Sequence, residues 1–222
     1  MQNVMVIVAH PDDEVLGCGG FIQNLVKAGS SVYVLYANAG YVLRKYTSGS
    51  VDDVKNQIDN VNGYLKTSGY VLGQFTAGEM DTYPIRELVD FISEQLKAYN
   101  IDTVITHADT DLHQDHIAVN KACMVCCRFK YQTKIKTVLT FATISSSDIS
   151  PITSIDFNYY VEINKQTLQR KISCMEFYTH ELLSMPKNRG PKPITVWAEF
   201  LGLQSGVRYA EGFKLIRSIQ KI

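Results

Sequence analysis

The sequence has no excess of charge of either sign. Its 22 Lys and Arg residues balance 22 Asp and Glu residues, and no long run of one sign occurs along the chain. Proteins that bind nucleic acid or an anionic membrane surface usually carry a concentrated basic patch. The balance therefore argues against both partners and favours a task on a small molecule.

Long apolar stretches are also missing. The opening residues, MQNVMVIVAH, contain an apolar run that is too short for a membrane span or a secretion signal, and no basic residues precede it. We therefore expect a cytoplasmic protein with no membrane-spanning segment.

Cysteine is scarce, and its number is odd: Cys18, Cys123, Cys126, Cys127 and Cys174. A chain of 222 residues can bury a sizeable core without disulfides, so we expect reduced thiols. Cys123 and Cys126 form a lone CxxC pair, with no second pair or nearby histidine at ligand spacing. We interpret them as small buried residues on a helix.

What the sequence does contain is an alternation of short β-branched runs with helical patterns. The runs predict strands at residues 4–9, 31–37, 70–75 and 101–107, and the helical patterns predict helices at 19–29, 51–66, 84–99 and 116–129. Such alternation is typical of a parallel sheet with helices on both faces and right-handed crossovers.

The predicted fold class is therefore α/β, with a Rossmann-like parallel sheet and an active site at the C-terminal edge of the strands. We expect one domain over residues 1–222. Residues 1–145 would form its doubly wound core, and residues 146–222 would be an extension that completes the substrate site. In the extension we predict strands at 159–163 and 209–218 and a helix at 165–183.

Three acidic residues come directly after the first predicted strand, in the stretch AHPDDEVLGCGG. Asp12, Asp13 and Glu14 are neighbours, and carboxylates repel one another more strongly where the dielectric is low. A positive partner is therefore expected beside them. Because His10 and Asp13 are three residues apart on a tight turn, their side chains can converge on one cation.

A second histidine-rich stretch, DLHQDH, follows the predicted strand that ends at His107. It should open at the same edge of the sheet, and a catalytic zinc needs a third protein ligand. His113 and His116 are both candidates. Asp115 lies between them and can orient one imidazole while the other binds metal. Asp115 is equally compatible with a role as N-cap of the helix that follows.

Together, AHPDDE and the HxDH motif about a hundred residues later resemble the PIG-L/LmbE-type family of zinc-dependent N-acetylglucosaminyl deacetylases. Weaker similarity runs through GEMDTYPIRELV, FATISSSD and YAEGFKLIR. The resemblance implies a zinc site formed by His10, Asp13 and His116. It also implies that Asp12 is the general base and that His113, oriented by Asp115, stabilises the oxyanion.

By this resemblance the chain is a hydrolase that removes acetyl from an N-acetylated amino sugar, such as an N-acetylglucosamine conjugate in surface-glycan or antibiotic-sugar biosynthesis. The cofactor would be Zn²⁺ or another divalent transition metal, the partner would be the sugar substrate, and homo-oligomerisation is left open. A sugar-binding protein without activity and an amidase for a non-sugar amide are the alternatives.

A nucleotide-binding oxidoreductase is not favoured, because the glycines of GCGG do not make GxGxxG and follow three acids. We expect these glycines to let the helix approach the sheet.

The sequence departs from the family pattern in regions expected to face the substrate. Gln57 and Asp59 stand where many members carry an Arg and a Glu, and MPKN, Met185–Asn188, replaces an HPRS-like segment. Arg44, in the YVLRKYTSGS stretch, is a candidate for a replacement contact to the sugar, but a solvated loop charge is the favoured interpretation. These changes bear on the identity of the sugar more than on the reaction.

Overall fold

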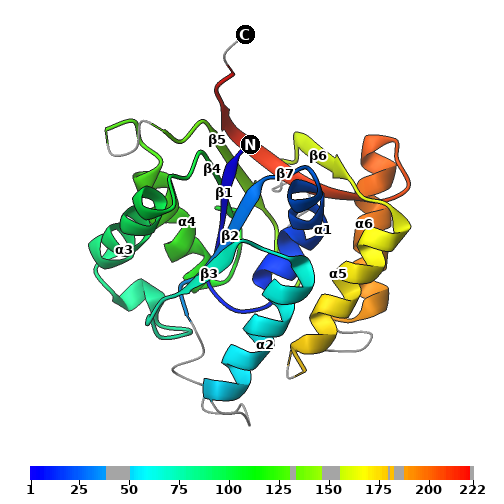
Figure 1. Ribbon diagram of the computed structural model, residues 1–222, viewed down its shortest axis with the longest axis horizontal. Helices are drawn as coiled ribbons and strands as arrows, with labels where there is room; N and C mark the ends of the chain where they lie inside the picture. Colours follow the sequence, from blue (N-terminus) through cyan, green and yellow to red (C-terminus); the bar gives the residue numbers. More distant parts are fainter. Residues whose placement is uncertain (39–50, 131–133, 147–155, 180, 183–187, 221–222) are drawn as a thin grey trace.

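The computed structural model describes residues 1–38, 51–130, 134–146, 156–179, 181–182 and 188–220. In these residues seven strands form one sheet, with helices packed on both of its faces (Figure 1). The strands are β1 (Asn3–Val8), β2 (Ser31–Tyr36), β3 (Gly69–Leu72), β4 (Thr103–His107), β5 (Thr137–Phe141), β6 (Tyr159–Glu162) and β7 (Ala210–Ser218). The helices are α1 (Asp13–Lys27), α2 (Val51–Leu65), α3 (Ile85–Ala98), α4 (Gln114–Cys126), α5 (Lys165–Phe177) and α6 (Pro191–Ser205), with a 3₁₀ turn η1 (Met80–Thr82).

The order of the strands is β3-β2-β1-β4-β5-β7-β6. Strands β1 to β5 pair in parallel, which confirms the predicted parallel core. The sheet is nevertheless mixed, because β7 runs antiparallel to both β5 and β6. The C-terminal part of the chain therefore extends the parallel core with an antiparallel edge, a common addition to doubly wound sheets.

Strand β1 lies at the centre of the sheet and is covered on both sides. Val4, Val6 and Val8 belong to the core beneath α1, α2, α5 and α6, whereas Met5 and Ile7 belong to the core beneath α3 and α4. A strand buried on both faces needs apolar residues at every position. This explains why β1 appears in the sequence as a continuous apolar run rather than an alternating one.

Most of the predicted elements of the first half are present. Helix α1 begins six residues earlier than expected, at Asp13 rather than Gly19, and β5 and α6 were not predicted. The CxxC cysteines are buried on α4, and all five cysteines are free thiols, as expected. Gly17 allows α1 to approach the sheet, because a Cβ added there would lie 2.1 Å from the Phe141 ring of β5.

The sheet order reverses between β1 and β4, which are neighbours although α1, α2 and α3 separate them in the chain. Loops after two such strands diverge to opposite faces of the sheet and leave a crevice at the carboxyl ends. The carboxyl ends of β1 and β4 lie at the lower side of Figure 1. The two histidine-containing stretches follow these two strands.

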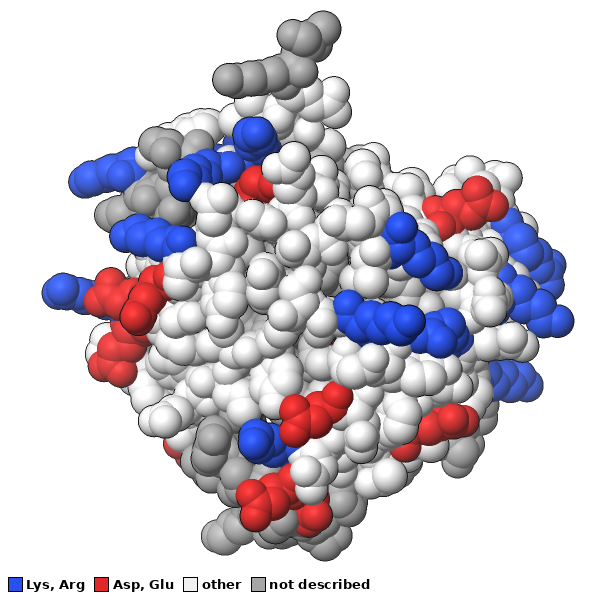
Figure 2. Space-filling model, in the orientation of Figure 1, with Lys and Arg blue, Asp and Glu red and all other residues white. Residues whose placement is uncertain are grey.

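The surface carries both signs of charge. On the face drawn in Figure 2, Lys and Arg side chains and Asp and Glu side chains are scattered, and an uncharged area lies near the centre. Within the described ranges, no helix combines the length and apolar character needed to span a bilayer.

Candidate metal centre and active site

The turn after β1 brings the side chains of His10 and Asp13 to the crevice. Asp12 adopts a left-handed backbone conformation, with φ 105°, and α1 starts at the next residue. The carboxylate of Asp13 folds back onto the turn, where its Oδ2 accepts a hydrogen bond from the His10 backbone N–H at 2.9 Å. This local bond holds the His10 and Asp13 side chains on the same side of the turn.

His10, Asp13 and His116 form a compact set of donor atoms. The Oδ2 atom of Asp13 lies 3.4 Å from Nδ1 of His10 and 3.2 Å from Nε2 of His116. Ligands about 2.0–2.1 Å from a tetrahedral zinc are separated by about 3.3 Å, so both distances match an edge of a coordination tetrahedron. The three side chains brought together are the three that the resemblance implies, and they fit a divalent metal.

Each imidazole of this set has a carboxylate on its other nitrogen. Nε2 of His10 lies 2.8 Å from Oδ2 of Asp115, and Nδ1 of His116 lies 2.9 Å from Oδ2 of Asp111. Such partners fix the tautomer and the ring orientation of metal-binding histidines. They leave Nδ1 of His10 and Nε2 of His116, the two imidazole nitrogens nearest the Asp13 carboxylate, available to a metal.

The two carboxylates are themselves anchored. Asp115 accepts hydrogen bonds from the backbone N–H groups of Gly78 and Met80, at 2.5 and 3.0 Å. Asp111 accepts from the His113 backbone N–H at 2.9 Å and from the Ser146 hydroxyl at 3.0 Å. The start of the GEMDTYPIRELV stretch thus helps to build the site through its backbone N–H groups, a role that its weak similarity to the family did not specify.

Two other groups of side chains have metal-ligand spacing, but in each a histidine nitrogen already accepts a hydrogen bond from a backbone N–H. In the group His107, Asp111 and His116, Nε2 of His107 accepts a hydrogen bond from the Ala9 backbone N–H at 2.9 Å. In the group His10, His113 and Asp115, Nδ1 of His113 accepts from the Asp115 backbone N–H at 3.2 Å. The set with Asp13 at its centre is therefore the best candidate.

Burial and neighbouring charges set the protonation of this cluster. Burial lowers the pKa of His116, but Asp13 and Asp111 outweigh it and raise the pKa to about 10. Burial raises the pKa of Asp13, but His116, His107 and His10 together hold it well below its ordinary value. Without metal the cluster thus favours an imidazolium beside a carboxylate, and a metal must displace that proton.

Asp12 lies in the same crevice but outside the donor set. Its carboxylate is buried, and its Oδ2 accepts no hydrogen bond from the described residues; the Arg189 guanidinium nitrogen Nη1 lies 3.3 Å away. Burial raises the pKa of Asp12 to about 7, although Arg189 opposes this rise. A carboxylate with these properties can take up and return a proton near neutral pH.

Glu14 does not face the crevice. Its Oε2 accepts from the Asp12 backbone N–H at 3.1 Å and its Oε1 from the Tyr178 hydroxyl at 2.7 Å. Burial raises the pKa of this carboxyl to about 7. These contacts give Glu14 a part in holding the turn that carries Asp12.

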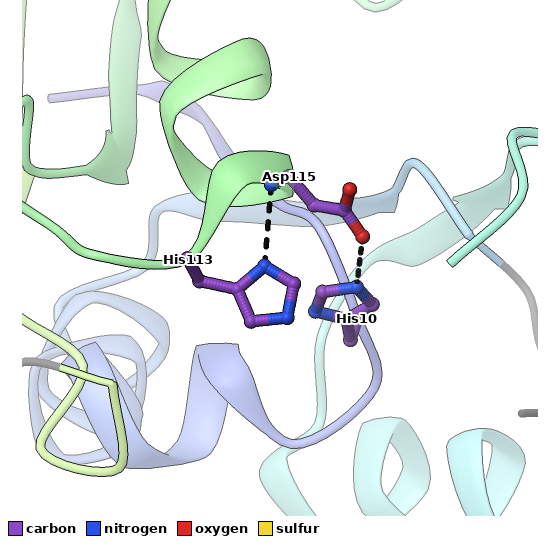
Figure 3. Close-up of side chains that lie close together, drawn as sticks. All are labelled: His10, His113 and Asp115. Atoms are coloured by element: carbon purple, nitrogen blue, oxygen red, sulfur yellow. Dashed lines mark hydrogen bonds and ion pairs between the residues drawn. The ribbon is translucent and has the colours of Figure 1, made fainter. Parts of the chain in front are cut away.

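The expected pairing of His113 with the Asp115 carboxylate is wrong. Figure 3 shows that this carboxylate points to His10, whereas His113 receives only the backbone N–H of Asp115. His113, not Asp115, is the N-cap of α4, because its side chain accepts that N–H. Burial and the neighbouring His10 and His116 lower the pKa of His113 to about 4, so it is neutral and carries its proton on Nε2.

A small cavity of about 30 Å³ lies beside these residues. It is lined by residues of both halves of the chain: His10, Pro11, Asp12, Asp13, His113, His116, Ser145, Ser146, Glu181 and Arg189. Arg189 also forms an ion pair with Glu181. Sequence reasoning gave neither residue a role, although Arg189 directly follows the MPKN segment that stands in place of the family's HPRS-like segment.

The residues that depart from the family pattern lie elsewhere or are not described. Gln57 and Asp59 lie on α2 and do not line this cavity; the Asp59 carboxylate accepts from the Tyr70 hydroxyl at 2.5 Å. Arg44 and Met185 to Lys187 lie outside the described residues. Asn188 donates to the Ile144 carbonyl at 2.9 Å.

Comparison with known proteins agrees with the fold and the motifs. The family model of PIG-L, GlcNAc-PI de-N-acetylase, matches residues 5–127, more than half of the chain. The chain belongs to the PIG-L family. Over 134 residues it is 32% identical to the uncharacterized deacetylase YaiS of Escherichia coli K12, covering 57% of this chain and 69% of the relative.

Solved structures share the whole fold at low sequence identity. The N,N'-diacetylchitobiose deacetylase of Pyrococcus horikoshii, in complex with an inhibitor, is 20% identical and superposes with a TM-score of 0.79, covering 97% of this chain and 84% of that one. GalB of Pseudomonas putida KT2440, a 4-carboxy-2-hydroxymuconate hydratase, is 14% identical with a TM-score of 0.73, and each chain is fully covered. Because the same architecture carries a deacetylase and a hydratase, the reaction must be argued from the site.

The carboxylates behind the histidines give a first testable consequence. An Asp115→Asn variant keeps the shape but loses the charge that orients His10, so we expect divalent metal to bind about 10- to 100-fold more weakly. Competition with a chromogenic chelator measures this affinity. Asp90→Asn, at an exposed carboxylate on α3, is the matched control and should bind as wild type does. Equal affinity in all three proteins would contradict the proposed orientation of His10.

Proposed function

We propose that this protein is a metal-dependent hydrolase that removes the acetyl group from an N-acetylated amino sugar. His10, Asp13 and His116 would hold Zn²⁺ or another divalent transition metal, and Asp12 would be the general base. The observation that carries the proposal is the meeting of these four side chains at one crevice in a member of the PIG-L family. Three ligands and a separate, non-ligating carboxylate are the parts that amide hydrolysis by an activated water requires.

When bound, the metal would lower the pKa of a water molecule and polarise the acetamide carbonyl. Asp12 is the group that handles protons. Its buried carboxylate takes the proton from the attacking water and gives it to the leaving nitrogen, so one carboxyl group serves both halves of the reaction. The neighbouring Arg189 opposes protonation of Asp12 before substrate binds, which keeps the base ready.

His113 would stabilise the negative charge that develops on the carbonyl oxygen. Because its Nδ1 accepts the Asp115 backbone N–H, its Nε2 carries the proton and is free to donate. A neutral imidazole fixed in this way can donate to an oxyanion without gaining a proton first. Asp115 contributes to this step through its backbone and to the metal site through its side chain.

The cavity is much smaller than a sugar, so only the acetamide end of a substrate would enter it. The rest of the substrate would lie at the mouth, where Glu181 and Arg189 from the C-terminal part meet the loops of the first half. This arrangement supports the expectation that residues 146–222 complete the substrate site of a single domain. We propose a small sugar or sugar conjugate of surface-glycan or antibiotic-sugar biosynthesis, processed in the cytoplasm.

The experiment is a substrate panel followed by mass spectrometry. Metal-loaded and metal-stripped protein are incubated with N-acetylglucosamine, its conjugates and non-sugar acetamides, and acetate and free amine are measured. We expect both products from an N-acetyl sugar, only with metal. Product from non-sugar acetamides alone would identify a different amidase, and saturable binding of sugars without any product would identify a binding protein; either result would overturn the proposal.

A further inference from the structure

Helix α1 is broken one turn after it starts. Cys18 has φ −148° and ψ 22°, far from helical values, so the turn from Asp13 to Gly17 is separated from the rest of the helix. In an unbroken helix the Gly20 N–H would donate to the Leu16 carbonyl. Here the Leu16 carbonyl and the Gly20 N–H instead bind two side chains from distant parts of the chain.

Lys171 of α5 and Glu211 of β7 are inserted at the break. Nζ of Lys171 donates to the Leu16 carbonyl at 3.0 Å and to Oε1 of Glu211 at 2.6 Å. Glu211 in turn accepts the N–H groups of Gly20, at 2.8 Å, and Phe21, at 2.6 Å. The ion pair therefore connects the carbonyl end of the first turn to the amide end of the remaining helix.

Both charged side chains are almost fully buried, with 4% of the Lys171 side chain and 3% of the Glu211 side chain exposed. A buried ion pair gives little net stability over apolar residues of similar volume, because both charges lose their hydration. Its directional hydrogen bonds can, however, fix a geometry that apolar packing would leave loose. The geometry fixed here is the angle between the two parts of α1.

Helix α5, which carries Lys171, also holds the start of the first turn of α1. Tyr178, at the C-cap of α5, donates to Glu14, and Glu14 accepts the Asp12 backbone N–H in its left-handed conformation. The segment that carries Asp12 and Asp13 is thus held at one end by Tyr178 and at the other by Lys171 and Glu211.

We propose that the Lys171–Glu211 ion pair is a positioning element for the metal and the general base. It sets the direction of the first turn of α1 and so places the Asp13 carboxylate between His10 and His116. The inference rests on the proposed metal site and extends it to residues that touch neither metal nor substrate. It also gives a role to the GCGG motif: a Cβ on Gly20 would lie 3.0 Å from Oε1 of Glu211 and 2.8 Å from Ile163, so only glycine leaves room for the carboxylate.

The test measures Co²⁺ binding to metal-stripped protein, by affinity and by the visible d–d spectrum, which reports coordination geometry. Glu211→Gln removes the charge, and Gly20→Ala displaces the carboxylate without changing it. For both variants we expect Co²⁺ to bind about 10- to 100-fold more weakly, with an altered spectrum. If Glu211→Gln does not fold, Gly20→Ala alone decides.

Two controls separate positioning from general loss of stability. Gly63→Ala, on α2, adds a methyl group that, among the described residues, has no atom within 4 Å apart from the backbone of its own helix. Ile92→Ala leaves a cavity in the core on the opposite face of the sheet and lowers the melting temperature. Both should keep the wild-type affinity and spectrum.

A Gly20→Ala variant that binds Co²⁺ as the controls do would overturn the positioning role and leave the metal site standing. The same holds if affinity falls equally in Gly20→Ala and Ile92→Ala. Wild-type protein that takes up no Co²⁺ would overturn the proposed metal site, and the positioning role with it. The failure of the inference and the failure of the proposed function are therefore distinguishable.

Discussion

An Asp12→Asn enzyme is expected to keep its metal and lose most of its turnover. Asp12 lies outside the donor set, so the affinity for metal should stay within a few-fold of wild type. The amide cannot take up the proton of the attacking water, and kcat should fall by about 10²- to 10⁴-fold, the usual contribution of a positioned general base. KM for the sugar should change little. Steady-state kinetics on the best substrate of the panel, with metal content measured on the same samples, checks both parts.

Asparagine is the appropriate replacement for two reasons. It is nearly isosteric with aspartate, and it tolerates the positive φ of 105° that most residues would find strained. Asp52→Asn, at an exposed acid in the first turn of α2, serves as the matched control and should keep wild-type kcat. If Asp12→Asn strips the metal, or keeps near-wild-type kcat with metal bound, Asp12 is not the base.

Replacing a proposed metal ligand should, unlike Asp12→Asn, remove the metal as well as the activity. We expect about one divalent metal per wild-type chain, and close to none in Asp13→Ala or His116→Ala after dialysis, because two remaining ligands bind such an ion poorly. Activity should fall with the metal. Elemental analysis of the purified proteins is the measurement.

The control is again a carboxylate outside the site, Asp90→Asn, which should retain its metal. Equal metal in wild type and His116→Ala would remove His116 from the ligand set and direct attention to His113 or His107. Metal loss in Asp13→Ala together with metal retention in Asp12→Asn would show that Asp13 is a metal ligand and that the adjacent Asp12 is not.

The parallel core could be predicted from the sequence because its signals are local. The central strands are continuous apolar runs, each followed by a helical pattern, and the rule that ligands bind beyond the carboxyl ends then places AHPDDE and DLHQDH together. The proximity of His10 and Asp13 could also be predicted from their spacing, because both lie on one turn that is closed by a hydrogen bond between them.

Elements held by distant residues could not be predicted in this way. The early start of α1 runs through Asp13, Glu14 and the glycines of GCGG, and Asp and Gly have poor helical propensity. It depends on Lys171 and Glu211, more than 140 residues away in the chain. Helix α6 was missed because it begins Pro-Lys-Pro with β-branched residues after it. Strand β5 was also missed, although at five residues it is as long as β4.

The orientation of the site side chains was the least accessible feature. Spacing alone shows that Asp115 is near His113 in sequence, but helical geometry turns its carboxylate away, toward His10 and the N–H groups of Gly78 and Met80. Arg189 reaches Asp12 across 177 positions of the chain. Such contacts follow from the assembled fold and have no local signature.

The central claim, hydrolysis of an acetamide, is tested most directly by running the reaction in ¹⁸O-labelled water with the metal-loaded enzyme and an N-acetyl sugar conjugate. The account predicts free amine and acetate in equal amounts, with one heavy oxygen in each acetate. Formation of labelled acetate must be slower in the Asp12→Asn variant and must stop when the metal is removed. A substrate that gains labelled water while keeping its acetyl group, as a hydratase would produce, or one that releases no acetate from any sugar conjugate, would contradict the account.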